Sequence, residues 1–288
     1  MKFYAKFLLF CSICVAFIAV QWSGPSFNEE SLKGARVLVT GASTGIGEQL
    51  AYHYARLGAQ LVITARRANV LEQVVNKCLE LGAQKALFIP ADMANPSDAD
   101  SVVQYAIEKL GGLDFLVLNH IGPGPYGMWD GDVENIRWLL QVNFLSYVQM
   151  VQKALPTLEK SKGSIVVVSS LLGKICTPFV LPYTTTKFAL NGFFGSLQHE
   201  LAMQGSNVSV TISTLGLIDT ESAMEKIKGY INVTAYPAHE AAWHIIGAGA
   251  SRQSESFYPS YTYYACLFRD WFPHYRDLAI RNSYTYNP

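Results

Sequence analysis

Hydrophobic positions follow two alternating patterns along residues 35–255. Short runs rich in Val, Ile and Leu are typical of strands buried on both faces, and they read ARVLVT, QLVIT, KALFIP, LDFLVL and SIVVV. Between them lie stretches with helical spacing, such as EQLAYHYARLG and FALNGFFGSLQHEL. This alternation predicts an α/β fold, a Rossmann-type doubly wound parallel sheet in a single domain. Ligands bind such a sheet at the carboxyl ends of its strands.

A glycine-containing loop follows the first predicted strand and leads into a helix. It consists of Gly41, Ala42, Ser43, Thr44, Gly45, Ile46 and Gly47. Glycines let the backbone approach a pyrophosphate closely, and a helix N-terminus supplies amide donors and a favourable dipole. The order of strand, loop and helix predicts a dinucleotide site, with a plain tight turn as the alternative.

Two arginines follow the second predicted strand, where an NAD site would usually carry an acidic residue for the ribose 2′-hydroxyl. They are Arg66 and Arg67, and no acidic residue occurs from Leu57 to Val70. Guanidinium groups bind phosphate bidentately. The pattern therefore predicts NADP(H) as the cofactor, whereas the alternative is that these arginines are merely solvated.

A possible acid/base pair follows the predicted strand that ends in Ser169 and Ser170. Tyr183 and Lys187 are four residues apart and share one face of the next predicted helix. A free phenol titrates near ~10, and an adjacent ammonium stabilises its phenolate. Ser170 is placed to hydrogen-bond a substrate oxygen on which charge develops. These three residues predict proton transfer to or from an alcohol or ketone, although Tyr and Lys at this spacing are also a common surface pair.

Other polar residues lie at predicted strand ends. Asp92 follows the third strand, and Asn119, His120 and Ile121 follow the fourth. His120 has the chemistry of a base or a metal ligand, but no partner cluster is visible. A packed or backbone-bonded histidine is therefore favoured, and no metal site is predicted.

The amino terminus carries an apolar segment, residues 7–22, behind Lys2 and Lys6. A retained signal anchor is favoured over a cleaved signal peptide, because no small-x-small cleavage site is evident. Basic residues in front of an anchor predict a lumenal domain at the endoplasmic reticulum membrane, and cleavage would instead predict secretion. Asn207 and Asn232 would be glycosylation acceptors in either case.

Composition limits the class of partner. The 22 basic and 22 acidic residues balance, and no basic stripe predicts nucleic-acid binding. Residues 256–288 are dense in Tyr, Phe and Trp, which predicts contact with a membrane or a second subunit, or packing on the chain's own domain. The predicted organisation is a signal segment at 1–22, a linker at 23–34, the Rossmann domain at 35–255 and an aromatic tail at 256–288.

Taken together, these motifs resemble the short-chain dehydrogenase/reductase family. The resemblance rests on Thr40-Gly-x-x-x-Gly-Ile-Gly47, Asn119, Asn143 within VNFLSYV, Ser170 and Tyr183-x-x-x-Lys187, and it spans about Lys33 to Arg252. It implies that Tyr183 is the proton donor or acceptor and Ser170 the partner of the substrate oxygen. It also implies that Lys187 binds the nicotinamide ribose and that Asn143 holds a water in a proton relay.

Within this family the chain is similar to the 11β-hydroxysteroid dehydrogenases, in LNHI, GSIVVVSSLLGK, TKFAL and LGLIDTESAM. That similarity implies a steroid-like hydrophobic substrate, a homodimer and membrane contact. The cofactor-lining residues it implies are Gly41 to Gly47, Arg66, Arg67, Asp92, Met93, Asn119, His120, Ile121, Tyr183, Lys187, Ile218, Asp219, Thr220, Glu221 and Ser222. The implied substrate-binding residues are Ser170, Leu171, Val180 and Leu217.

Three departures from the steroid enzymes bear on specificity. Thr44 replaces a lysine of the glycine loop, which predicts a weaker preference for NADP(H). Thr177 stands where an aromatic residue is expected, and residues 122–129 form an unusual Pro/Gly-rich edge. A retinoid, lipid or xenobiotic carbonyl is therefore the alternative substrate. A non-catalytic NADP-binding interaction protein is the alternative of another class.

Overall fold

The computed structural model describes Ser12, residues 27–230 and residues 234–285. Apart from Ser12, the predicted signal segment lies outside the described residues, and so does Asn232. No helix among the described residues combines the length and the apolar character needed to cross a bilayer.

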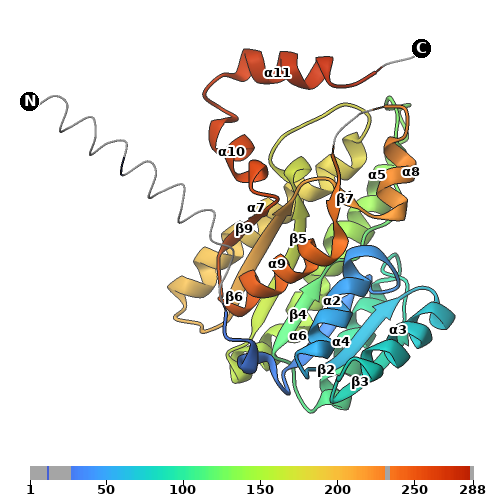
Figure 1. Cartoon of the computed structure of the whole chain (residues 1–288), viewed down its shortest axis with the longest axis vertical. Helices are drawn as coiled ribbons and strands as arrows, with labels where there is room; N and C mark the ends of the chain where they lie inside the picture. Colours follow the sequence, from blue (N-terminus) through green and yellow to red (C-terminus); the bar gives the residue numbers. More distant parts are fainter. Residues whose placement is uncertain (1–11, 13–26, 231–233, 286–288) are drawn as a thin grey trace, which may run out of the picture.

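A seven-stranded, fully parallel sheet lies at the centre of the molecule (Figure 1), in the order β3-β2-β1-β4-β5-β6-β9. Its strands are β1 (Arg36–Thr40), β2 (Gln60–Ala65), β3 (Lys85–Pro90), β4 (Phe115–Leu118), β5 (Ser164–Ser170), β6 (Ser209–Leu215) and β9 (Glu255–Tyr258). A separate two-stranded sheet pairs β7 (Ile218–Asp219) with β8 (Tyr236–Pro237). The predicted single-domain Rossmann-type sheet is therefore confirmed.

Helices cover both faces of the sheet. One face packs against α2 (Gly45–Arg56), α3 (Ala68–Glu80) and α9 (Ala238–Ala250), and the other against α4 (Pro96–Leu110), α6 (Ser146–Ser161) and α7 (Leu181–Met203). The alternation of side chains along a strand supplies both cores: Val37 and Val39 of β1 belong to the first, and Leu38 to the second. Burial on both faces explains why the strands read as continuous apolar runs.

The order of the strands reverses at β1. The chain leaves β1 toward β2 and β3 on one side and returns to β4 on the other, so β1 pairs with both β2 and β4. A crevice forms at such a reversal, at the carboxyl ends of the two central strands. Gly41 follows β1 and Asn119 follows β4, so both residues border this crevice.

The remaining helices and helical turns lie outside these two layers. They are α5 (Val133–Leu140), a π-helical turn η2 (Gln141–Leu145) that joins α5 to α6, the 3-10 turns η1 (Glu29–Leu32) and η3 (Leu171–Gly173), and α8 (Glu221–Ile227), α10 (Tyr261–Phe268) and α11 (Pro273–Asn282). Figure 1 shows α10 and α11 standing apart from the sheet beyond β9.

Two elements cross the boundaries predicted for the domain. β9 begins at Glu255 and pairs with β6, so the sheet continues to Tyr258, three residues into the segment predicted as tail. At the other end, Leu32 of η1 is fully buried in the core although it belongs to the predicted linker. The packed body of the molecule thus begins before residue 35 and ends after residue 255.

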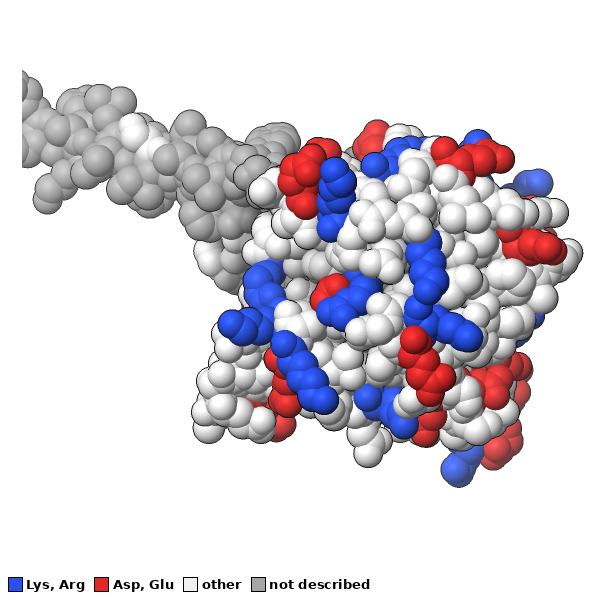
Figure 2. All heavy atoms as spheres, turned by 90° about the horizontal axis from the view of Figure 1, so that it is seen from below, with Lys and Arg blue, Asp and Glu red and all other residues white. Residues whose placement is uncertain are grey.

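Charged side chains are interspersed rather than segregated on the face shown in Figure 2, where Lys and Arg stand among Asp and Glu. A partly buried ion pair joins the starts of β1 and β4, because Arg36 Nη2 lies 2.7 Å from Asp114 Oδ1. This pair lowers the pKa of Asp114, through hydrogen bonds that outweigh the effect of desolvation.

Candidate active site

The glycine loop has a backbone that side chains would disrupt. Gly41 has a φ of 66°, and a Cβ there would lie 2.7 Å from His120 Cα. A Cβ on Gly47 would collide with the carbonyl oxygen of Gly41. Asn119 fixes the loop from the end of β4, because its Nδ2 donates to the carbonyl oxygens of Thr40 and Gly41 at 3.1 and 3.3 Å.

The N-terminus of α2 fits an anionic group. The helix begins at Gly45, within the predicted loop, and its N-cap residue Thr44 makes no side-chain capping bond. The first amides of α2 are therefore not satisfied by a side-chain cap, and such amides bind phosphate well. Together with the closely packed glycines, this arrangement fits the pyrophosphate of a dinucleotide.

The predicted 2′-phosphate site lies beside this loop. Arg66 and Arg67 follow β2 and are exposed, and Arg67 Nη2 donates to Ser43 Oγ at 3.4 Å. After β3, Asp92 is exposed while Met93 is buried, and Asp92 Oδ1 accepts from the Ala94 amide.

The segment after β6 also reaches the glycine loop. A Cβ on Gly45 would lie 3.0 Å from Thr220 Cγ2, so Thr220 lies directly against the loop. Thr220 caps α8, since its Oγ1 accepts from the Ala223 amide at 3.3 Å. Ile218 is buried, whereas Asp219, Glu221 and Ser222 are exposed. The structure thus brings together Gly45 and Thr220, two predicted cofactor-binding residues that are 175 positions apart in the sequence.

Ser170, Tyr183 and Lys187 lie together at the carboxyl end of β5. Ser170 is the last residue of β5, and its side chain lies close enough to Tyr183 to lower the pKa of that phenol. Lys187 is 1% exposed, and its Nζ donates to the Val168 carbonyl at 2.8 Å. The same Nζ lies 5.5 Å from the centre of the Tyr183 ring. The predicted spacing on one helix face therefore produces a compact cluster.

Burial dominates the pKa values of this cluster. It raises the pKa of Tyr183 to about 12, against the opposing effect of the Ser170 hydrogen bond. It lowers the pKa of Lys187 to about 7. The sequence suggests that the ammonium lowers the phenol's pKa, but in this structure desolvation is the largest effect on both groups.

Asn143 lies in the π-helical turn η2 and is fully buried. Its Oδ1 accepts from the Gly122 amide at 2.7 Å, and its Nδ2 donates to Thr186 Oγ1 at 3.2 Å. Thr186 Oγ1 in turn donates to the Tyr183 carbonyl at 2.8 Å. Asn143 is thus connected by hydrogen bonds to the helix that carries Tyr183 and Lys187.

His120 is a packed histidine, as its lack of a partner cluster predicts. It is 7% exposed, and its Nε2 lies 3.1 Å from the Val142 carbonyl oxygen. Burial lowers its pKa to about 3, so the ring is neutral at physiological pH. Within the described residues, no three His, Cys, Asp or Glu side chains are grouped so that they could hold a metal ion.

The predicted substrate-binding residues frame the loop between β5 and α7 and the end of β6. Leu171 begins η3, Val180 is the N-cap residue of α7, and Leu217 lies just after β6. All three are half-buried. Ile121 borders the same end of the sheet and is 49% exposed.

Four aromatic side chains pack together beside Val180, and the sequence did not predict this group. We call it the aromatic wall: Tyr126, Phe179, Tyr230 and Tyr284. The ring centre of Phe179 lies 5.9 Å from that of Tyr126, 5.4 Å from that of Tyr230 and 5.8 Å from that of Tyr284. Phe179 is buried with a φ of 70°, and its carbonyl accepts from the Gly127 amide. An aromatic residue is thus present two positions beyond Thr177.

The chain's end contributes to this wall. Tyr284 follows α11, and the Thr285 amide donates to the Tyr230 carbonyl at 3.0 Å. The abundance of tyrosine in the tail was a visible signal, but the contact between residues 179 and 284 joins positions too distant in sequence to be read from a local pattern.

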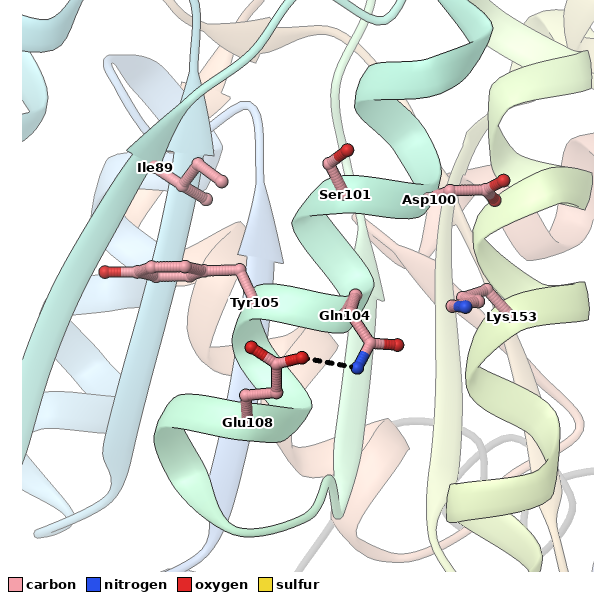
Figure 3. Close-up of a pocket in the computed structure, with 7 residues that line it drawn as sticks. All are labelled: Ile89, Asp100, Ser101, Gln104, Tyr105, Glu108 and Lys153. Carbon is pink, nitrogen blue, oxygen red and sulfur yellow. Dashed lines mark hydrogen bonds between the residues drawn. The ribbon is translucent and has the colours of Figure 1, made fainter.

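A polar groove of about 410 Å³ lies away from this site (Figure 3), lined by Ile89, Asp100, Ser101, Gln104, Tyr105, Glu108 and Lys153. Its only hydrogen bond drawn there runs from Gln104 Nε2 to Glu108 Oε1, at 2.6 Å. Because α4 starts at the carboxyl end of the sheet and runs back along its face, these residues lie on the flank of the sheet and not at the crevice.

Comparison with known proteins agrees with this geometry. The short chain dehydrogenase family model matches residues 35–230. The chain is 83% identical over 288 residues, all of both chains, to the hydroxysteroid 11-beta-dehydrogenase 1-like protein of Danio rerio. It is 53% identical over 234 residues to the protein of that name from Homo sapiens. The aligned region covers 81% of this chain and 74% of that relative.

Solved structures share the fold. A short chain dehydrogenase from Burkholderia cenocepacia in complex with NADP superposes with a TM-score of 0.70 at 28% identity, over 78% of this chain and 96% of that one. A 3-oxoacyl reductase from Agrobacterium tumefaciens gives the same TM-score at 23% identity, which shows the fold alone. By the match of the family model and the identity to its relatives, this chain belongs to the short chain dehydrogenase family.

Proposed function

We propose that this protein is an NADP(H)-dependent oxidoreductase that interconverts a hydroxyl and a ketone on a steroid-like substrate. The observation that carries the proposal is the cluster of Ser170, Tyr183 and the buried Lys187, at the carboxyl edge of the sheet that also carries the glycine loop. The chain's similarity to hydroxysteroid 11-beta-dehydrogenase 1-like proteins supports the steroid class.

The cofactor proposal rests on the fit of the crevice and on the NADP present in a related solved structure. The glycine loop and the N-terminus of α2 would hold the pyrophosphate. Arg66 and Arg67 would bind the 2′-phosphate, and Lys187 would hold the nicotinamide ribose. When bound, NADP(H) supplies or accepts the hydride.

Proton transfer falls to Tyr183 in this proposal. In reduction, the carbonyl carbon gains a hydride while the phenol O–H bond breaks and its proton moves to the substrate oxygen. In oxidation, the phenolate takes the proton back. Because burial raises the pKa of Tyr183 to about 12, the phenol is protonated at neutral pH and is ready for reduction.

The other three residues support this transfer. Ser170 would hydrogen-bond the substrate oxygen and stabilise the charge that develops there. Lys187 would return a proton to Tyr183 through its own ammonium, whose pKa near 7 suits exchange at neutral pH. Asn143 would hold a water in this relay.

The substrate side favours a large apolar molecule. Aromatic walls and exposed apolar residues such as Ile121 and Met224 bind flat hydrophobic molecules without strong discrimination. A retinoid, lipid or xenobiotic carbonyl therefore stays the second candidate. Both candidates require the same residues at the reacting oxygen.

The cellular setting is also a proposal. We infer a lumenal domain at the endoplasmic reticulum membrane, held by the segment at residues 1–22, with secretion after cleavage as the alternative. Four apolar side chains of α10, α11 and their connection are strongly exposed, which supports contact with a membrane or with a second subunit in a homodimer: Phe268, Trp271, Phe272 and Tyr275.

The test compares three carbonyl substrates with the purified full chain in detergent: an 11-oxo glucocorticoid, retinaldehyde and a small aromatic ketone. We expect the steroid to have the highest kcat/KM with NADPH. If the steroid is the poorest substrate in both directions, the steroid assignment is wrong. If NADPH binds and none of the three is turned over, the non-catalytic alternative is favoured.

A further inference from the structure

His120 is held by hydrogen bonds from both of its ring nitrogens. Nδ1 lies 2.9 Å from Thr40 Oγ1 at the end of β1. Nε2 lies 3.1 Å from the Val142 carbonyl oxygen and 2.8 Å from Ser146 Oγ. The Tyr147 hydroxyl donates to the His120 carbonyl at 2.7 Å, and its ring packs on the imidazole at 4.4 Å between centres. The residue therefore joins β1 and β4 to the turn η2.

The partners determine which nitrogen carries the proton. A carbonyl oxygen only accepts, so Nε2 must be the N–H that donates to Val142. The single hydroxyl proton of Ser146 goes to the same carbonyl at 2.6 Å, so Ser146 Oγ is also free to accept from Nε2. Val142 O thus receives two side-chain donors at the π-helical turn.

The other nitrogen must accept. Thr40 Oγ1 already accepts from the amides of Asn119 and His120, at 2.9 and 3.3 Å, which uses both of its lone pairs. Its hydroxyl proton has two acceptors within reach, the Val117 carbonyl oxygen at 3.2 Å and His120 Nδ1 at 2.9 Å. A second ring proton, on Nδ1, would find no acceptor at Thr40. The geometry therefore requires the neutral Nε2–H tautomer.

The Nε2–H group of this tautomer donates to the turn η2, which contains Asn143. Val142 precedes Asn143, and the Ser146 amide reaches back five residues to the Gln141 carbonyl, which marks the π-helical turn. On the other side, the Gly122 amide, two residues after His120, donates to Asn143 Oδ1 at 2.7 Å. The His120 segment thus holds Asn143 from two directions, by its side chain through Val142 and by its backbone through Gly122.

We propose that His120 is a positioning residue: through the bond from its Nε2–H to Val142 O it fixes the π-helical turn and so the amide of Asn143. Its part in turnover rests on the proposed function. His120 touches neither the reacting oxygen nor the phenol, and it acts through Asn143. The ring does not carry protons in the reaction, because its Nε2 proton is held in the hydrogen bond to Val142 O.

The first test compares His120→Leu with His120→Gln in the full chain in detergent. Leucine has a similar volume and no donor, whereas the glutamine Nε2 reaches the region of Val142 O. We expect His120→Leu to lower kcat at least ~10-fold with the NADPH dissociation constant changed less than ~3-fold, and His120→Gln to retain at least ~10-fold more kcat than His120→Leu. Equal losses in the two variants, or a loss confined to NADPH affinity, would overturn the proposal.

The second test needs neither turnover nor a folded leucine variant. In the parent protein labelled with ¹⁵N, the ring signals that His120→Gln removes should show the Nε2–H tautomer without titration from pH 5 to pH 9. The Asn143 side-chain amide, identified by its loss in Asn143→Asp, should exchange slowly with solvent. An Nδ1–H tautomer, a titrating ring or a rapidly exchanging amide would contradict the positioning role. An absence of turnover in the parent would count against the proposed function, and these signals would then decide the role of His120.

Discussion

At Tyr183 and Lys187, desolvation changes the pKa values more than the interaction between the two side chains does. From the sequence, a cation four residues from a phenol is expected to lower the phenol's pKa. In the structure, Lys187 donates to the Val168 carbonyl and lies 5.5 Å from the centre of the Tyr183 ring. Desolvation then raises one pKa and lowers the other. Burial, which decides the outcome, is not visible from residue spacing.

The depressed pKa of Lys187 predicts a dependence of folding stability on pH. The folded pKa is about 7 and the ordinary value is 10.5, so between these values the unfolded chain binds more protons. Stability should therefore rise with pH over this window, by up to about 1.4 kcal/mol for each pH unit. The raised pKa of Tyr183 opposes this only above pH 10.

Lys187→Met isolates this effect, because it removes the amine and keeps an apolar chain of similar length. Thermal unfolding at pH 6.5 and pH 9 should show a larger rise of Tm for the parent than for the variant. We also expect Lys187→Met to be at least as stable as the parent at pH 6.5. Parallel changes of Tm in both proteins would show that Lys187 is not buried with a depressed pKa.

Cofactor choice is also expected to depend on single residues. Arg66 is exposed beside the glycine loop, and Thr44 supplies no second cation there. Arg66→Asp should lower the ratio of kcat/KM with NADPH to kcat/KM with NADH at least ~10-fold, because a carboxylate repels the 2′-phosphate and accepts from a free 2′-hydroxyl. Arg137→Asp, at an exposed arginine of α5, is the matched control. An unchanged ratio in Arg66→Asp would make the 2′-phosphate assignment wrong.

Among the elements, those with strong local patterns were predicted well. β1, the glycine loop and α2 follow in the expected order, although α2 begins at Gly45, inside the predicted loop. The turn η2 was not predicted, since its i to i+5 hydrogen bond has no local sequence signal. Its Val142 carbonyl lies 3.1 Å from the ring Nε2 of His120, which is 22 residues away.

The aromatic wall is a second element-level feature that the sequence does not disclose. Its members come from the loops before α5 and α7, from the end of α8 and from the chain's end beyond α11. Each is one tyrosine or phenylalanine among many in the chain. The wall exists because the tail returns to Tyr230, and that return is a tertiary contact.

Removal of Tyr284 tests whether this wall contacts the substrate. Tyr284→Ala should raise KM for the steroid about 3- to 10-fold, as expected for lost contact with one ring edge, and should leave the NADPH dissociation constant unchanged. Tyr275→Ala is the matched control, because Tyr275 lies on α11 and is 70% exposed. Equal KM values in Tyr284→Ala and Tyr275→Ala would place the substrate away from the wall.

For the whole molecule, the sequence predicted the parallel sheet and its single domain. The two residues that shifted the limits of the packed body, Leu32 and Tyr258, were not predicted, because short segments at the ends of a domain become ordered only by packing on the rest. Local hydrophobic patterns cannot report such packing.

Topology is a whole-molecule prediction that glycosylation tests. Asn207 is exposed in the turn before β6, where a sugar would meet no packed element. Expressed in cells, the full chain should lose mass with glycosidase and stay with membranes after an alkaline wash. The Asn207→Gln variant should show a smaller loss of mass with glycosidase, because the sugar on this residue is absent. Recovery of the glycosylated protein mainly from the medium would indicate a cleaved signal.

The central claim is that Tyr183 donates the proton in an NADPH-dependent reduction of a carbonyl. The most direct test supplies an 11-oxo steroid and NADPH in which both hydrogens of the hydride-donating nicotinamide carbon are deuterium. Mass spectrometry then measures deuterium in the steroid alcohol. We predict one deuterium in each product molecule, formed at least ~100-fold more slowly by Tyr183→Phe although that variant still binds NADPH. Deuterium transfer by Tyr183→Phe at the parent's rate would contradict the claim, as would an NADPH-bound parent that transfers none to any of the three carbonyls.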